Sequence, residues 1–157
     1  MTPIRPLRED EAPPWELLLD ADPSRHMVER YLSSSDTYVL ETEAGIIGVV
    51  VLCPLGPNEL EIKNIAVDDD HQGRGWGRRL LAFSIDEARA RRVQRLHIGT
   101  GNSSIGQLAL YQKLGFRIVG VDRDFFVRGY PEPLFENGIR CRDMIRLQLD
   151  LQAGDDD

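Results

Sequence analysis

Cysteine, lysine and long apolar runs are all scarce in this chain. Only Cys53 and Cys141 occur, far apart, which excludes a disulfide framework or a thiolate zinc site. No apolar run approaches the roughly 20 residues that a bilayer span needs. The start, MTPIRPLREDEAPP, lacks the apolar segment of a secretory signal. We therefore expect a reduced, cytoplasmic setting.

The chain is acidic, with 26 Asp and Glu against 19 Lys and Arg and a net charge of −7. This balance argues against nucleic acid or an anionic membrane as a partner of the whole surface. Hydrophobic residues make up 41% and charged residues 29%, which is typical of a globular domain. The length of 157 residues predicts one domain, placed at 1–152, followed by an acidic tail at 153–157.

The basic residues are nearly all arginines, because Lys63 and Lys113 are the only lysines. Seven arginines fall within residues 74–95, a stretch whose only acids are Asp86 and Glu87. Such a segment in an acidic protein suits a small polyanionic ligand. The alternative, which charge alone favours, is a solvated and salt-bridged helix face.

Hydrophobic periodicity predicts a mixed α/β fold in the order β-α-α-β-β-β-α-β-α-β-β. A weak strand at 3–7, helices at 10–20 and 23–33, and a hairpin of strands 37–41 and 46–53 come first. Residues 54–58 should break the chain. The next strand has period two, with Leu60, Ile62, Asn64 and Ala66 on one face and Glu61, Lys63, Ile65 and Val67 on the other.

The second half begins with an amphipathic helix at 75–92. A strand at 96–99 precedes a helix at 104–114, where Ser104 and Gln107 have the spacing of a capping box and Gly115 is a stop signal. Residues 116–121 and 125–128 resemble strands, 129–138 should be a loop, and 141–151 should be the last strand.

The sharpest feature joins the strand that ends at Val67 to the following helix, and reads Asp-Asp-Asp-His-Gln-Gly-Arg-Gly-Trp-Gly-Arg-Arg over residues 68–79. Three alternate glycines let the backbone turn tightly and approach a ligand without a Cβ in the way. The first amides of a helix lack internal partners and lie at its positive end, where they bind phosphate well. The pattern is neither a Walker loop nor GxGxxG. A purely structural turn is the alternative.

Gln72-x-x-Gly75-x-Gly77 resembles the coenzyme-binding motif of the GNAT superfamily of acetyl-CoA-dependent N-acetyltransferases. A second family signature follows, namely Asn102 after a strand and then a helix that ends in Tyr111-Gln-Lys-Leu-Gly-Phe. The resemblance is strongest over residues 38–121. It implies a mixed, mostly antiparallel sheet flanked by about four helices, with acetyl-CoA as co-substrate.

The resemblance also implies a reaction, in which an amine attacks the thioester carbonyl of acetyl-CoA. The amide of Val67 would donate to the thioester oxygen, and the amides of 72–79 would hold the pyrophosphate. The residues implied in coenzyme binding are Ile65, Ala66, Val67, Gln72, Gly73, Arg74, Gly75, Trp76, Gly77, Arg78, Arg79, Asn102 and Tyr111.

Three side chains carry implied roles with open alternatives. Tyr111 matches the family tyrosine that protonates the leaving thiolate, although it shares a helix face with Leu108 and Leu114 and could simply pack there. Asn102 would bind the pantetheine arm or cap the following helix. Glu61 is placed where several family members carry a catalytic glutamate, and the alternative is the wet side of an alternating strand.

The acceptor remains a primary amine of a small molecule or peptide, in a site that the family shapes with segments equivalent to 15–32 and 125–138. A metal is not expected, because the acids at 68–70 have only His71 beside them. A homodimer is compatible with the sequence. The competing functions are a non-catalytic CoA-binding module and an unrelated nucleotide-binding α/β protein. ATP or NAD would stabilise the latter against thermal unfolding.

Overall fold

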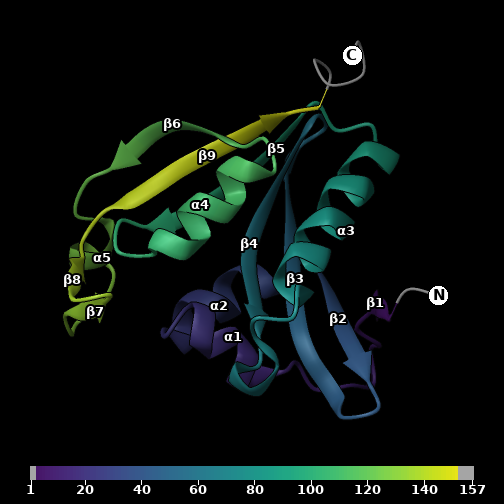
Figure 1. Cartoon of the computed structure of the whole chain (residues 1–157). Helices are drawn as coiled ribbons and strands as arrows, with labels where there is room; N and C mark the ends of the chain where they lie inside the picture. Colours follow the sequence, from purple (N-terminus) through teal and green to yellow (C-terminus); the bar gives the residue numbers. More distant parts are fainter. Residues whose placement is uncertain (1–2, 152–157) are drawn as a thin grey trace. The chain divides into compact units, whose positions relative to one another are not determined.

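The computed structural model describes residues 3–151 and contains two compact units, of which the first ends at Val93 and the second begins at Gln94 (Figure 1). The predicted acidic tail at 153–157 lies outside the described residues. Within residues 3–151, no helix is long and apolar enough to cross a membrane.

The first unit is an antiparallel meander with helices on its faces. Its elements are β1 (Ile4–Pro6), α1 (Trp15–Ala21), α2 (Arg25–Leu32), β2 (Asp36–Thr42), β3 (Gly45–Gly56), β4 (Glu59–Val67), the short 3-10 turn η1 (Asp69–His71) and α3 (Trp76–Ala90). Strands β1, β2, β3 and β4 pair in chain order, each antiparallel to the next. The predicted hairpin and the strand at its N-terminal side are confirmed.

Two predicted boundaries in this unit are wrong. Helix α1 begins at Trp15 rather than at residue 10, because Pro13 and Pro14 directly precede it and proline fits only the first turn of a helix. Strand β3 continues to Gly56, so the predicted break at 54–58 shrinks to a two-residue turn. Pro54 stays in register opposite Leu60, next to a β-bulge, which is a position where a strand tolerates proline.

The core of the first unit has two sides. Leu17, Leu18 and Val28 of α1 and α2 pack against Val39, Val49 and Val51 of the strands. On the other side lies α3, whose Leu80 approaches Gly48 so closely that a Cβ there would lie 3.1 Å from the leucine Cδ1. The predicted amphipathic character of this helix is confirmed, because Leu80, Leu81, Ser84, Ile85 and Ala88 are buried on one side of it.

The second unit contains β5 (Arg95–Gly101), α4 (Ile105–Lys113), β6 (Arg117–Asp122), α5 (Phe125–Arg128), β7 (Leu134–Glu136), β8 (Ile139–Cys141) and β9 (Met144–Asp150). Strand β9 pairs antiparallel with both β5 and β6, and β7 and β8 form a separate hairpin. The predicted class, a mixed α/β fold with a mostly antiparallel sheet flanked by helices, is confirmed.

The chain between β6 and β9 differs most from the prediction. Residues 125–128 form a helical turn instead of a strand, because the carbonyl of Asp124 accepts the amides of Val127 and Arg128 and the Asp124 amide donates to Asp143 Oδ1. The predicted loop at 129–138 contains β7. The turn between β7 and β8 is Asn137-Gly138. Both residues have positive φ, 56° and 73°, as a tight two-residue hairpin requires.

Helix α4 ends as predicted but begins differently. Gly115 has φ of 105°, and the amides of Gly115 and Phe116 donate to the carbonyls of Gln112 and Tyr111, which is a Schellman cap. The predicted capping box is wrong, since Ser104 is the N-cap residue but makes no side-chain capping bond. Its hydroxyl donates instead to Glu136 Oε1 at 2.7 Å, on β7 of the hairpin.

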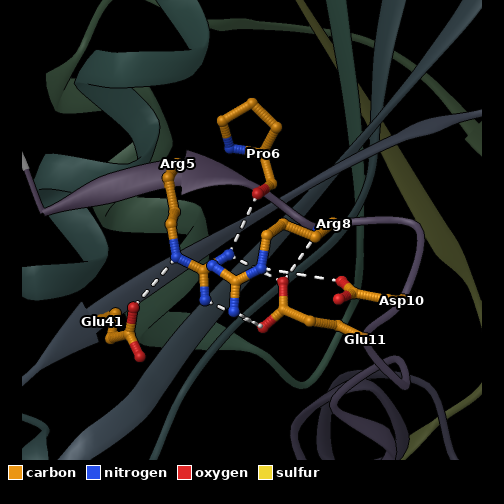
Figure 2. Close-up of polar contacts among 6 residues, drawn as sticks. All are labelled: Arg5, Pro6, Arg8, Asp10, Glu11 and Glu41. Carbon is orange, nitrogen blue, oxygen red and sulfur yellow. Dashed lines mark hydrogen bonds and ion pairs between the residues drawn. The ribbon is translucent and has the colours of Figure 1, made fainter.

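Arg5 ties the short strand β1 to its surroundings (Figure 2). Its Nε donates to Glu41 Oε1 at 2.9 Å, and its two terminal nitrogens donate to the Glu11 carboxylate at 2.7 and 2.9 Å. The Glu11 carboxylate also accepts the amide of Arg8. The Arg5 guanidinium, and then the Arg8 amide, lower the pKa of Glu11 from 4.5 to about 2.

This network predicts an acid-sensitive contribution to stability. Because the pKa of Glu11 is lower in the folded state, its contribution is present above pH of about 4.5 and is lost as pH falls towards 2. Urea unfolding should show wild type more stable than Glu11→Gln at neutral pH, with the difference shrinking through this range. Glu43→Gln, in the exposed β2–β3 turn, serves as the control. A difference that stays constant with pH would contradict the assignment.

Candidate functional site

The turn between β4 and α3 is built around two glycines in the left-handed region. Gly73 has φ of 77° and Gly75 has φ of 83°, a conformation that other residues rarely adopt. Neither glycine has a neighbouring atom within 4 Å of where a Cβ would lie. Their backbone therefore faces open space, and the glycines are required by conformation rather than by crowding.

Helix α3 presents unbonded amides at its start. Its N-cap, Gly75, provides no side-chain cap, and the first helical bond runs from the Arg79 amide to the Gly75 carbonyl at 3.1 Å. The amides of Trp76, Gly77 and Arg78 precede that bond, so the helix itself offers them no acceptor. The first turn carries no acidic residue. The site therefore combines aligned N–H donors with an uncompensated positive helix end, which suits a phosphate.

Gln72 fastens this turn to the end of β4. Its Nε2 donates to the Val67 carbonyl at 3.0 Å and to Asp69 Oδ1 at 3.2 Å. The Asp68 side chain accepts the Asp70 amide and thereby caps η1. These acids thus serve the fold of the turn, and no group of three side chains within 3–151 has the arrangement of a metal site.

Four arginines of the arginine-rich segment show two different settings. Arg74, Arg78 and Arg79 are exposed around the glycine turn, and the Arg79 guanidinium lies 4.9 Å from the Trp76 ring centroid. Arg91, at the far end of α3, is instead held by other side chains. It bonds Glu87 and the Tyr38 hydroxyl, both at 2.9 Å, and pairs with Asp36 at 3.1 Å. Of these four, the first three are placed to add charge at the turn.

The backbone amides near the end of β4 alternate in direction. The Asp68 amide bonds the Ile47 carbonyl at 2.8 Å, and Val67 lies opposite Gly48 in the register. Because successive pairs of an antiparallel ladder alternate, the amides of Val67 and Ile65 point away from β3, while that of Ala66 points towards it. Val67 thus directs its N–H to the other edge of the strand, as a donor to a bound carbonyl would.

A β-bulge at Lys63 rearranges the faces of β4. Val51 lies opposite Asn64 whereas its neighbour Leu52 lies opposite Ile62, so Lys63 has no opposite residue. The predicted period-two alternation is therefore wrong across this point. Glu61, opposite Cys53, shares a face with Asn64 rather than lying behind it.

Glu61 lies on a buried surface. Its relative exposure is 7%, and its Oε1 lies 3.3 Å from the Lys63 ammonium. The face it shares with Asn64 is the one on which α1 and α2 pack, because Val51 belongs to that core. The alternative of a solvated strand face is thus wrong for Glu61.

Tyr111 belongs to the second unit, in the last turn of α4. The side chain is 4% exposed, and its ring centroid lies 6.2 Å from that of Phe116, just beyond the Schellman cap. Burial raises the pKa of the phenol above its ordinary value of 10. The group therefore keeps its proton at neutral pH, as a proton donor must.

Asn102, also in the second unit, holds the chain before β9. Its Oδ1 accepts the amides of Arg142 and Asp143 at 2.8 and 2.9 Å, and its Nδ2 donates to the Arg140 carbonyl at 3.1 Å. The alternative role of a helix cap is wrong, because Ser104 is the N-cap residue of α4.

The first unit thus contains the candidate groups of β4 and of the α3 start. In the second unit Asn102 precedes α4 and Tyr111 lies in its last turn. Sequence reasoning missed Asn64 of β4 and Tyr31 of α2, whose side chains bond to each other at 3.0 Å; Asn64 also donates to the Leu18 carbonyl of α1. The one available signal was an asparagine at a position of the strand pattern that should be buried.

A family model described as "Acetyltransferase (GNAT) family" matches residues 4–116. The chain is 49% identical over 137 residues to the uncharacterized N-acetyltransferase YvbK of Bacillus subtilis (strain 168), covering 87% of this chain and 88% of that one. It is 38% identical over 98 residues to the [Ribosomal protein bS18]-alanine N-acetyltransferase of Escherichia coli (strain K12), covering 62% of this chain and 63% of that enzyme.

A solved structure with the same fold holds acetyl-CoA. The crystal structure of a GNAT family acetyltransferase from Elizabethkingia anophelis with acetyl-CoA bound superposes with a TM-score of 0.91 at 46% identity, covering 94% of this chain and 96% of that one. A Bacillus subtilis acetyltransferase in complex with CoA gives a TM-score of 0.89 at 45% identity, covering 96% and 99%.

The glycine turn predicts opposite effects of one methyl group at two nearby positions. Gly75→Ala should lower the free energy of unfolding by about 1–2 kcal/mol, because φ of 83° is strained for alanine. Gly77→Ala should leave stability unchanged or raise it by up to about 1 kcal/mol, since Gly77 is helical and its Cβ meets no atom within 4 Å. Urea unfolding of both variants checks this, and equal destabilisation would contradict the turn geometry.

Proposed function

The chain belongs to the GNAT family of acetyltransferases, and we propose that it transfers the acetyl group of acetyl-CoA to a primary amine of a small molecule or peptide. Structural relatives bind acetyl-CoA or CoA. We further propose a single N-acetyltransferase domain over 1–152, in a cytoplasmic setting. The match to the acetyl-CoA-bound Elizabethkingia structure over 94% of the chain supports this extent.

The observation that carries the proposal is the set of donors at the start of α3. We propose that the amides of 72–79 bind the pyrophosphate of the coenzyme, with Arg74, Arg78 and Arg79 adding charge. The left-handed glycines keep side chains out of this space, and the helix end supplies N–H groups without internal acceptors. Ile65, Ala66 and Val67 would contact the coenzyme along the adjoining strand.

In the proposed reaction the acceptor nitrogen attacks the thioester carbonyl carbon. A C–N bond forms, the carbonyl oxygen becomes an oxyanion, and the Val67 amide donates to it. The intermediate then collapses, so that the C–S bond breaks and CoA leaves as a thiolate. Removing one such preorganised donor costs about 2.7–4 kcal/mol in transition-state stabilisation by analogy with other oxyanion sites.

Two side chains would move the protons. Glu61 would accept a proton from the acceptor nitrogen, directly or through water. Its burial beside Lys63 supports this role over that of a solvent-exposed surface acid. Tyr111 would give its proton to the departing thiolate, and burial, which raises the pKa of the phenol, keeps it protonated until the thiolate forms. Asn102 would contact the pantetheine arm through the second N–H of its amide.

A non-catalytic CoA-binding module is the weaker candidate. Relatives such as YvbK and the bS18-alanine enzyme are named as N-acetyltransferases. A binding module would also need only the glycine turn, without a buried acid on β4 or a buried phenol on α4.

An acceptor screen tests the proposal directly. Thiol release from acetyl-CoA is followed with polyamines, amino acids, aminoglycosides and peptides with free N-termini, and at least one class should give saturable turnover. Thermal shifts with CoA, ATP and NAD are measured alongside. CoA binding without turnover on any amine would support the binding module, and stabilisation by ATP or NAD but not CoA would support a nucleotide-binding protein.

Gly77→Ala should weaken CoA binding even though it does not weaken the fold. The added methyl group enters the space above the helix start where the pyrophosphate is proposed to lie, so calorimetry should show a Kd at least tenfold higher, about 1.4 kcal/mol. Gly120→Ala on β6, whose Cβ also meets nothing within 4 Å, should leave the Kd unchanged. An unchanged Kd for Gly77→Ala would contradict the proposed phosphate site.

Tyr111→Phe should lower turnover about 10²–10⁴-fold while the Kd for acetyl-CoA stays within about twofold. The substitution removes the proton donor and keeps the packed ring. Because burial raises the pKa of this phenol, wild-type turnover should show no loss from Tyr111 below pH of about 10. Tyr38→Phe is the matched control. Turnover of Tyr111→Phe close to wild type would rule out the proton-donor role.

A further inference from the structure

A polar cluster lies between β4 and the helices α1 and α2. It consists of Asp22, Tyr31, Glu61, Lys63 and Asn64, and the proposed chemistry uses only Glu61. Resting on the proposed function, we propose that Asn64 binds the acceptor amine through its Oδ1, with Tyr31 as a positioning residue. The ligand class is a primary amine or ammonium, which donates N–H bonds.

Asn64 is a buried amide with one unused group. It is 4% exposed, and its Nδ2 donates to the Leu18 carbonyl and to the Tyr31 hydroxyl oxygen, both at 3.0 Å. Its Oδ1 is buried and has no hydrogen-bond partner among residues 3–151. A flipped amide would point this oxygen at the Leu18 carbonyl, so the orientation is fixed. The protein therefore holds a buried acceptor that an N–H donor can satisfy.

The β-bulge places this oxygen on the same face as the proposed base. Asn64 lies three residues before Val67, and Lys63 is looped out between it and Glu61. Two oxygen-bearing side chains therefore point to one side of β4, on the strand that ends at the proposed thioester contact. A primary ammonium has three N–H donors, enough for both side chains.

Lys63 indicates that these surroundings accept a primary ammonium. Its Nζ lies 3.3 Å from Glu61 Oε1 and 5.9 Å from the centroid of the Tyr31 ring. Carboxylate and aromatic face are the two partners that favour an ammonium group. An acceptor ammonium would share these partners with Lys63 and would reach Asn64 Oδ1 once the side chains that bury this oxygen move aside.

Tyr31 holds the asparagine in place. Its hydroxyl oxygen accepts the Asn64 bond, and the hydroxyl is also hydrogen bonded to Asp22, which follows α1. Burial raises the pKa of Tyr31 to about 12, so the hydroxyl stays protonated and available to donate. The chain Asp22–Tyr31–Asn64 thus links both helices to the orientation of one amide.

The kinetic test uses the amine identified in the thiol-release screen. Asn64→Leu, of similar size, should raise the KM for the amine at least tenfold and leave the KM for acetyl-CoA within about twofold. Tyr31→Phe, which keeps the ring, should raise the amine KM by a smaller factor, about threefold or more. Tyr38→Phe, a half-buried tyrosine hydroxyl bonded to Arg91 on the same unit, should change neither constant. An unchanged amine KM in folded Asn64→Leu would overturn the proposal.

A second measurement needs neither a folded variant nor turnover. The side-chain amide resonances of Asn64 are followed in CoA-loaded wild type during titration with n-butylammonium chloride, with n-butanol as the neutral match. Saturable shifts with the ammonium alone support the proposal. Shifts elsewhere that leave Asn64 unmoved would mean that its Oδ1 holds a buried water only. If no amine releases thiol, the proposed function fails while this titration still decides whether Asn64 binds an amine.

Discussion

The account depends on backbone amides that the fold leaves without acceptors at the start of α3. Gly75 ends the preceding turn in the left-handed region, so the helix begins without a side-chain cap and directs its first N–H groups outward. Gln72 closes the turn against Val67, which aligns the helix start with the end of β4. The proposed coenzyme site depends on this one junction, whereas the direction of the Val67 amide follows from the register of β4 with β3.

The β-bulge at Lys63 is the second constraint. It reverses the faces of β4, so that Glu61 and Asn64 lie on the side covered by α1 and α2. A regular strand would have left one of them on the opposite face, where α3 packs. One looped-out residue therefore places a buried acid and a buried amide together on the strand that also carries the proposed oxyanion donor.

Much of the fold could be predicted, because the features that specify it are local. The glycine turn, the buried face of α3 and the Gly115 stop each depend on neighbours in sequence, and all are observed. The bulge at Lys63 could not be predicted, because it depends on register with β3 rather than on β4 itself. The missing capping bond of Ser104 also depends on a partner far away in sequence, because its hydroxyl donates to Glu136 on the β7–β8 hairpin. Asn137-Gly138 was a readable turn signal that the surrounding prolines obscured.

The most direct test of the central claim is an amide-resolved titration of the ¹⁵N-labelled protein with acetyl-CoA, which carries both the pyrophosphate and the thioester carbonyl. The account predicts saturable shifts concentrated at the amides of residues 72–79 and at Val67, with the largest at Trp76, Gly77 and Arg78. Saturable binding that moves amides elsewhere and leaves the start of α3 unperturbed would contradict it.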